Sequence, residues 1–181
     1  MLGAPAIPMA ENSVEGSLLS AEANGELYAK AEAQASLMRG VLKIVLRESD
    51  PATLEKQLRE FIGDKLPESQ IEPQMRRWAS AAFRNAMSYD PGLELKKITC
   101  PVLALYAEKD FSVPARLNLP AMRAALAGNK AAEVEELPDL NLLFQTADVG
   151  IGREANWAEE TMSPAVLRKI ADWVVRQGSR P

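Results

Sequence analysis

The chain has 181 residues, of which 47% are hydrophobic and 25% are charged, and its formal net charge is −4. This is the balance of an ordinary globular domain, and it lacks the basic excess that would indicate nucleic acid or an anionic lipid surface as a partner. Its single cysteine excludes an internal disulfide and fits a reducing compartment. Apolar runs such as VLALYA at 102–107 are too short to cross a bilayer. We therefore expect a cytoplasmic protein that binds neither nucleic acid nor membrane.

The N-terminal residues do not have the features of a signal peptide. MLGAPAIP at 1–8 lacks a basic segment followed by a long apolar stretch. Its pattern instead indicates the last residues of a buried strand and the loop that follows. On this interpretation, residues 1–11 belong to a larger unit whose beginning lies upstream.

Residues 12–92 have helical periodicity almost throughout. The segment SDPATLEKQLREFI predicts a helix that Asp50 caps and Pro51 opens. A further helix is predicted over 72–87, with Met75, Trp78 and Phe83 packing the helical region against the rest of the protein. The turn sequence YDPG at 89–92 ends this all-helical region.

After residue 98 the pattern changes to that of an α/β unit. CPVLALYAEKD at 100–110 is a continuous apolar run, which is typical of a strand buried on both faces in a parallel sheet. A helix ending at Gly128, a strand over 132–137 and a terminal helix over 162–178 follow. The inner face predicted for the last helix is Val166, Ile170, Trp173 and Val174. This order is that of half a doubly wound α/β fold.

Functional groups in open α/β sheets gather beyond the carboxyl ends of the strands. Asp110 is predicted three residues beyond the first strand, and the loop 138–143 follows the second. Both loops should therefore emerge at the same edge of the sheet. A carboxylate there that faces an imidazole would form the acid–base half of a hydrolytic triad.

Three segments resemble the C-terminal part of the α/β-hydrolase superfamily, especially its esterase and dienelactone-hydrolase-like members: KKITCPVLALYAEKDFSVP at 96–114, LPDLNLLFQTA at 137–147 and SPAVLRKIADWV at 163–174. The resemblance implies a partial α/β-hydrolase fold, in which a short, mostly parallel sheet is flanked by helices and preceded by an all-helical cap. It assigns 1–11 to the strand end and loop of the hydrolase core, 12–92 to the cap and 93–181 to the C-terminal part of the core.

The same resemblance assigns two site positions. It places Asp110 at the triad acid and Leu142 at the triad histidine, whereas the chain contains no histidine at all. The nucleophile motif G-x-S-x-G is also absent, since the nearest imitation, ENSVEG at 11–16, lacks the first glycine. The family hydrolyses carboxylic esters or related acyl bonds through a Ser-His-Asp triad, so we expect this chain to be catalytically incomplete.

Several alternatives stay open at this stage. The chain is either an inactive hydrolase-like protein, a non-catalytic binding or oligomerisation module, or an esterase whose nucleophile and histidine another polypeptide supplies. The expected partners are a small acyl or ester ligand in the cap cleft, and a second copy or a complementing chain at an unpaired sheet edge near MLGAPA and VLALY. We expect neither a cofactor nor a metal. Leu142 is interpreted as an apolar filler and Cys100 as a buried residue, and Lys109 would be a base only if its pKa were shifted.

Overall fold

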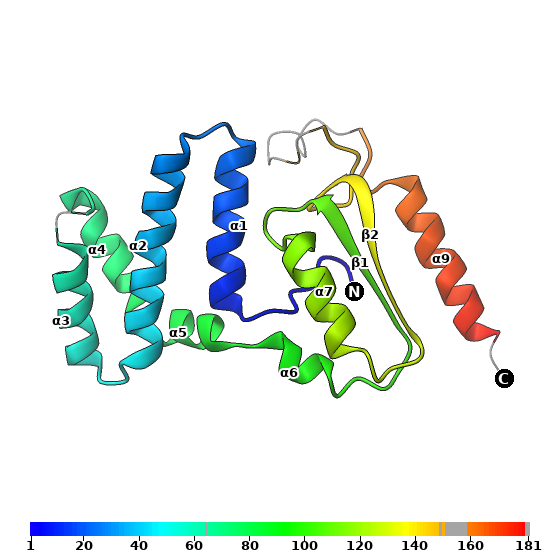
Figure 1. The fold of residues 1–181 in the computed structure, drawn as a ribbon, viewed down its shortest axis with the longest axis horizontal. Helices are drawn as coiled ribbons and strands as arrows, with labels where there is room; N and C mark the ends of the chain where they lie inside the picture. The colour runs from blue at the N-terminus through cyan, green and yellow to red at the C-terminus, as the bar shows by residue number, and fades with distance from the viewer. Residues whose placement is uncertain (64, 149, 151–158, 180–181) are drawn as a thin grey trace.

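The computed structural model describes residues 1–63, 65–148, 150 and 159–179. A helical bundle and an α/β part lie side by side (Figure 1). The elements in chain order are α1 (Met9–Ala23), α2 (Tyr28–Arg47), α3 (Pro51–Ile62), α4 (Glu68–Trp78), α5 (Ala81–Ser88), α6 (Pro91–Leu95), β1 (Val102–Lys109), α7 (Ala115–Ala125), β2 (Ala132–Asn141) and α9 (Pro164–Gly178). Among the described helices, none has the length and apolar character needed to cross a membrane.

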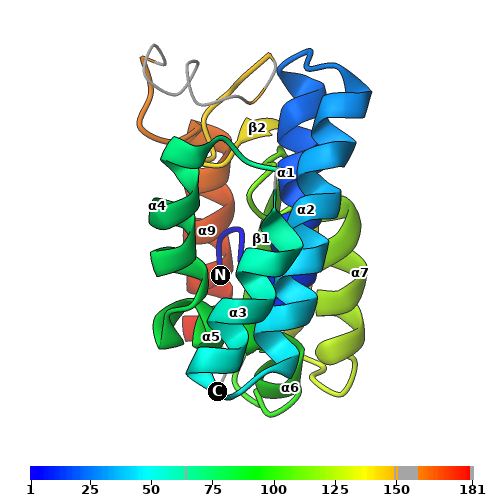
Figure 2. The ribbon, with the colours of Figure 1, turned by 90° about the vertical axis from the view of Figure 1, so that its left-hand side faces the viewer.

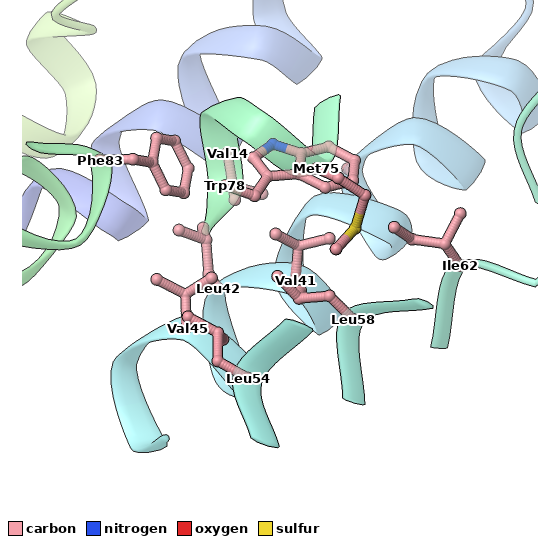
Figure 3. Close-up of a cluster of buried hydrophobic side chains, with 11 residues drawn as sticks. Val14, Val41, Leu42, Val45, Leu54, Leu58, Ile62, Met75, Trp78 and Phe83 are labelled. Atoms are coloured by element: carbon pink, nitrogen blue, oxygen red, sulfur yellow. The ribbon is translucent and has the colours of Figure 1, made fainter. Parts of the chain in front are cut away.

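The helical bundle has a hydrophobic core of its own. Figure 3 shows side chains from α2, α3 and α4 pointing toward one another in this core. Leu54, Leu58 and Ile62 recur every fourth residue and so share the buried face of α3. The predicted start of α3 is confirmed, because Asp50 accepts a hydrogen bond from Thr53 N at 2.8 Å and Pro51 is the first helical residue.

Two predictions for the bundle are wrong. The segment 72–87 is predicted as one helix, but it is divided between α4 and α5, because α4 ends at Trp78 and Ser80 caps the start of α5. Met75, Trp78 and Phe83 were expected to pack the helical region against the α/β part, but all three lie inside the bundle core. Seen from the side of the bundle, α3 and α4 lie in front and α9 lies far behind them (Figure 2). These side chains are therefore covered by neighbouring helices.

The sheet consists of β1 and β2, which run parallel from the pair Val102–Ala132 to the pair Ala107–Leu137. Alternate residues of β1 pack on opposite sides, since Tyr106 joins the core under α7 and Leu105 joins the core under α9. The expected burial of this strand on both faces is thus confirmed, as is a mixed α/β architecture with a short parallel sheet flanked by helices. The assignment of that architecture to the hydrolase superfamily stays a prediction.

The N-terminal residues lie along the other side of β1. Leu2 forms a parallel bridge with Leu105, where Gly3 N donates to Leu105 O and Leu105 N donates to Met1 O, both at 2.9 Å. Within the described residues, the segment VLALY is therefore flanked on both sides, by β2 and by the bridge at Leu2. Helix α1 begins at Met9, three residues before the predicted helical region.

Helix α9 packs differently from the expectation. Val166 is buried, and Ile170 and Trp173 pack against the same core, but the side chain of Val174 is 55% exposed. Val174 reaches past the packed face, beside Met1 and Leu2. Helix α7 ends at Ala125 rather than at Gly128.

Candidate functional site

Asp110 and Leu142 occupy matching places on neighbouring strands. Lys109, the last residue of β1, is paired in register with Asn141, the last residue of β2. Asp110 and Leu142 each follow directly, so the structure brings the two predicted positions to the same edge of the sheet. Two details differ from the prediction: Asp110 is the first residue beyond β1 rather than the third, and 138–141 belong to β2 rather than to a loop.

The Asp110 carboxylate is buried, and within the described residues only one of its two oxygens accepts hydrogen bonds. Asp110 is only 4% exposed to solvent. Oδ1 accepts hydrogen bonds from Ser112 N at 2.8 Å and from Val113 N at 3.1 Å. Oδ2 accepts no hydrogen bond from the residues that the structure describes, and it lies 3.1 Å from the place where a Cβ on Gly3 would be. One carboxylate oxygen is thus free to accept a donor.

No cation compensates this carboxylate within the described ranges. Burial raises the pKa of Asp110, and the hydrogen bonds from Val113 N and Ser112 N oppose this effect. The adjacent Lys109 is engaged elsewhere, because its Nζ lies 2.7 Å from Asp139 Oδ1 and 2.7 Å from Ala147 O. A buried carboxylate without a counter-charge is costly to keep, and such groups concentrate at functional sites.

Lys109 does not have the environment of a general base. Its hydrogen bond to Asp139 raises the pKa of the ammonium group above the ordinary lysine value. The side chain therefore stays protonated near neutral pH. This removes the role that the sequence left open for it.

Leu142 is not the apolar filler that the sequence suggested. It is 41% exposed, and Phe144, which is 2% exposed, is the loop residue that enters the core under α9. The turn is organised by Asn141, whose Oδ1 accepts hydrogen bonds from Leu143 N and Gln145 N. This is an Asx-type turn, and the side chain of Leu142 within it is exposed.

Helix α1 holds the loop after β1 from the other side. Asn12 Nδ2 donates to Ser112 O at 2.8 Å, and Asn12 Oδ1 accepts from Asn118 Nδ2 at 2.8 Å. Gly16 provides the close approach, since a Cβ there would lie 2.4 Å from Phe111 O. The loop carrying Asp110 is thus fixed between β1 and α1. Sequence reasoning missed this arrangement, and the only local signal was a glycine inside a helical pattern.

A groove of about 480 Å³ lies between α1, α2 and the loop residues Phe111 and Ser112. Serine, asparagine and glutamine side chains form most of its wall, including Ser13, Ser20 and Gln34. Binding an acyl chain requires an apolar wall. The groove therefore gives no support to the expected acyl or ester ligand.

The remaining candidate residues have structural surroundings. Cys100 is exposed, which corrects the expectation that it is buried. Glu133 and Glu135 pair with Arg176 and Lys169, so these acids connect β2 with α9. Across the described parts of the chain, no cluster of three His, Cys, Asp or Glu side chains could hold a metal ion.

Comparison with protein-family models, with curated proteins and with solved structures finds no match to this chain.

Proposed function

We propose that the chain is a scaffold of the α/β-hydrolase type, with Asp110 at the triad-acid position and no hydrolytic activity of its own. One observation carries this proposal. Asp110 is a buried carboxylate whose Oδ2 accepts no hydrogen bond within the described residues, and it lies at the same sheet edge as Leu142. In a hydrolytic triad the acid receives the imidazole N–H, fixes its tautomer and stabilises its charged form.

The chain lacks the groups that would act with this acid. It contains no histidine, so the proton transfer that contributes roughly 10²–10⁴-fold to such reactions is missing. No G-x-S-x-G motif provides an activated serine either. We therefore expect Asp110 to be a retained acid without a catalytic partner in this chain.

A histidine introduced at position 142 tests the geometry. Because the natural chain has no histidine, the Leu142→His variant has a single imidazole, whose ¹H NMR signals report its pKa without overlap. If the imidazole reaches Asp110, its pKa rises above the ordinary value of about 6.5, and the added change Asp110→Asn lowers it again. Leu143→His is the matched control, since Leu143 is equally exposed but is one residue further along the turn.

Equal imidazole pKa values in the Leu142→His and Leu143→His variants would show that position 142 does not face the acid, and the proposal would be wrong. The predicted inactivity is tested separately with p-nitrophenyl acetate and butyrate. We expect turnover at the buffer rate for the natural chain and for Leu142→His. The predicted inactivity would be wrong if the natural chain hydrolysed these esters and the Asp110→Ala change abolished that hydrolysis.

A second candidate function is that of a non-catalytic interaction module. The observation that favours it is the backbone of Leu2, whose N–H and C=O make no hydrogen bond within the described residues, beside the exposed side chains of Met1, Leu2 and Val174. Parallel sheets are normally covered on both faces, and their edges are normally paired or protected. Stable association through this edge would support the interaction role whatever the outcome at Asp110.

A further inference from the structure

We propose that the polar groove between α1, α2 and the loop after β1 binds a neutral sugar, either a single hexose unit or a disaccharide. The groove has a volume of about 480 Å³, which is within the range of about 300–1,000 Å³ typical of small-molecule sites. The proposal goes beyond both functions proposed above. It depends neither on the triad-acid assignment nor on association at the N-terminal residues.

Three elements that are far apart in the sequence build this groove. Helix α1 lies between α2 and the α/β part (Figure 1). Its residues Ser13, Ser17 and Ser20 lie along one side of the helix, because they recur at intervals of three or four, and they line the groove. Gln34 of α2 and Ser112 of the loop after β1 form the facing walls. The groove therefore contains side chains from both parts of the protein.

The walls offer hydrogen-bonding groups that the protein itself leaves free. The hydroxyl groups of Ser13, Ser20 and Ser112 make no hydrogen bond within the described residues, since only their backbone atoms are bonded. The side-chain amide of Gln34 is likewise without a partner in the described ranges, and it is exposed. Hydroxyl and amide groups both donate and accept hydrogen bonds. They therefore match the hydroxyl groups of a sugar, each of which also donates and accepts.

Asn12 adds a buried amide to the wall of the groove. It lines the groove although it is only 3% exposed. Its Oδ1 accepts from Asn118, and one N–H of its Nδ2 donates to Ser112 O. The second N–H of Nδ2 has no acceptor in the described part of the chain. Buried polar groups normally have a partner, and a ligand oxygen in the groove would supply the missing acceptor.

The charges around the groove select against ionised ligands. Among the described residues that line it, only Glu26 is charged, and its carboxylate lies 3.2 Å from Lys30 Nζ. A phosphate or carboxylate ligand would therefore meet no free cation, and an ammonium ligand would meet an acid that is already paired. Phe111 adds an aromatic ring, whose negative face attracts the C–H groups of a sugar ring. The groove thus favours a ligand that is polar but uncharged.

Chemical-shift titration of the ¹⁵N-labelled full chain tests the proposal. The probes are methyl α-D-glucopyranoside, methyl α-D-mannopyranoside, methyl β-D-galactopyranoside and maltose. Inorganic phosphate and butyrate are the anionic and the acyl comparison. We expect at least one of the four sugars to bind saturably in the millimolar range or below and to move the backbone amide signals of Ser13, Ser20 and Ser112. Phosphate and butyrate should move none of these signals.

Two variants in the wall should each weaken this binding about tenfold or more. Ser20→Leu replaces a free hydroxyl with an apolar side chain, and Gln34→Ala removes an exposed amide without disturbing the fold. Ser69→Leu is the matched control, because Ser69 is also a helical serine but lies on α4, outside the groove. It should bind as the natural chain does. Urea denaturation verifies that each variant is folded.

Thermal unfolding of the same variants gives a second readout. A ligand that binds only the folded state raises the midpoint of unfolding. Sugars at high concentration also stabilise proteins because they are excluded from the protein surface, and this effect needs no site. The sugar that binds should therefore raise the midpoint more in the natural chain and in Ser69→Leu than in Ser20→Leu. An equal rise in all three would show exclusion alone and would contradict the proposal.

The absence of saturable shifts with all four sugars would overturn the proposal, as would equal affinities of the natural chain and both wall variants. Saturable binding of phosphate or butyrate in place of the sugars would show that the ligand class is wrong. The imidazole titration at position 142 and any association of the chain are independent of these outcomes. The proposals can therefore fail separately.

Discussion

Asn12 of α1 and Asn118 of α7 are hydrogen-bonded to each other at 2.8 Å although 106 residues separate them in the chain. Both side chains are buried, and Asn118 Oδ1 also accepts the N–H of Ala6 at 2.8 Å. The two amides therefore join the helical bundle, the N-terminal segment and α7 at a single point.

We expect Asn118→Ala to destabilise the protein strongly. The change leaves Ala6 N and Asn12 Oδ1 buried without their partner, and each such group costs about 1–3 kcal/mol. The loss in free energy of unfolding is measured by urea denaturation. Asn24→Ala, which removes an exposed hydrogen bond to Ser20 O, should change it by less than about 0.5 kcal/mol. Similar losses in the free energy of unfolding for the two variants would contradict the stabilising role given to the Asn12–Asn118 hydrogen bond.

Gly16→Ala should also destabilise, although alanine normally stabilises a helix by about 0.5–1 kcal/mol relative to glycine. The added Cβ would lie 2.4 Å from Phe111 O, which is a backbone atom and cannot rotate away. Separating α1 from the loop should cost about 1–3 kcal/mol in chemical denaturation. Gly178→Ala in α9 meets nothing within 4 Å and should be neutral or stabilising. A stabilising Gly16→Ala would show that this close contact is not required.

Asp110→Asn should increase stability at neutral pH. Burial raises the pKa of Asp110 in the folded state, so the folded protein binds this proton more tightly than the unfolded chain does. The favourable contribution of the protonated group is complete below the unfolded value of about 3.9 and is lost as the pH rises through the raised folded pKa. Asparagine keeps an oxygen for Ser112 N and Val113 N but carries no charge.

Urea titrations between pH 3 and pH 8 measure this effect. The advantage of Asp110→Asn over the natural chain should grow across the window that begins near the ordinary aspartate value, and then remain constant. Asp110→Ala removes the acceptor altogether and should cost about 1–3 kcal/mol throughout. An advantage of Asp110→Asn that is independent of pH would show that the charge of the carboxylate is not its source.

The sequence predicted those parts of the fold that depend on local pattern. The apolar run 102–107 indicates a doubly buried strand because every residue must avoid water, and Asp50 followed by Pro51 indicates a helix start by capping chemistry. The length of β2 was missed because Pro138 and Asp139 are typical of turns. A shift in the register between Ala107 and Lys109 lets the strand continue through them.

The site was predicted in position but not in detail. A resemblance assigns Leu142 to a place in the chain but does not give the direction of its side chain, which depends on the turn built by Asn141. The Oδ2 atom of Asp110 lies beside Gly3, which is more than 100 residues distant in sequence. Such relationships follow from tertiary packing, and a single sequence does not encode them in any local pattern.

Among the residues that the structure describes, the apolar core of the bundle shares no buried side chain with either core of the α/β part. Burial of hydrophobic surface therefore stabilises each part separately, and the cooperativity of the whole chain depends on the few polar contacts of α1 with the loop after β1 and with α7. Weakening those contacts would leave two independently melting units, whose backbone amides would exchange with solvent at two distinct free energies of opening. The pair of asparagines then contributes to the stability of the fold and also joins its two parts into one folding unit.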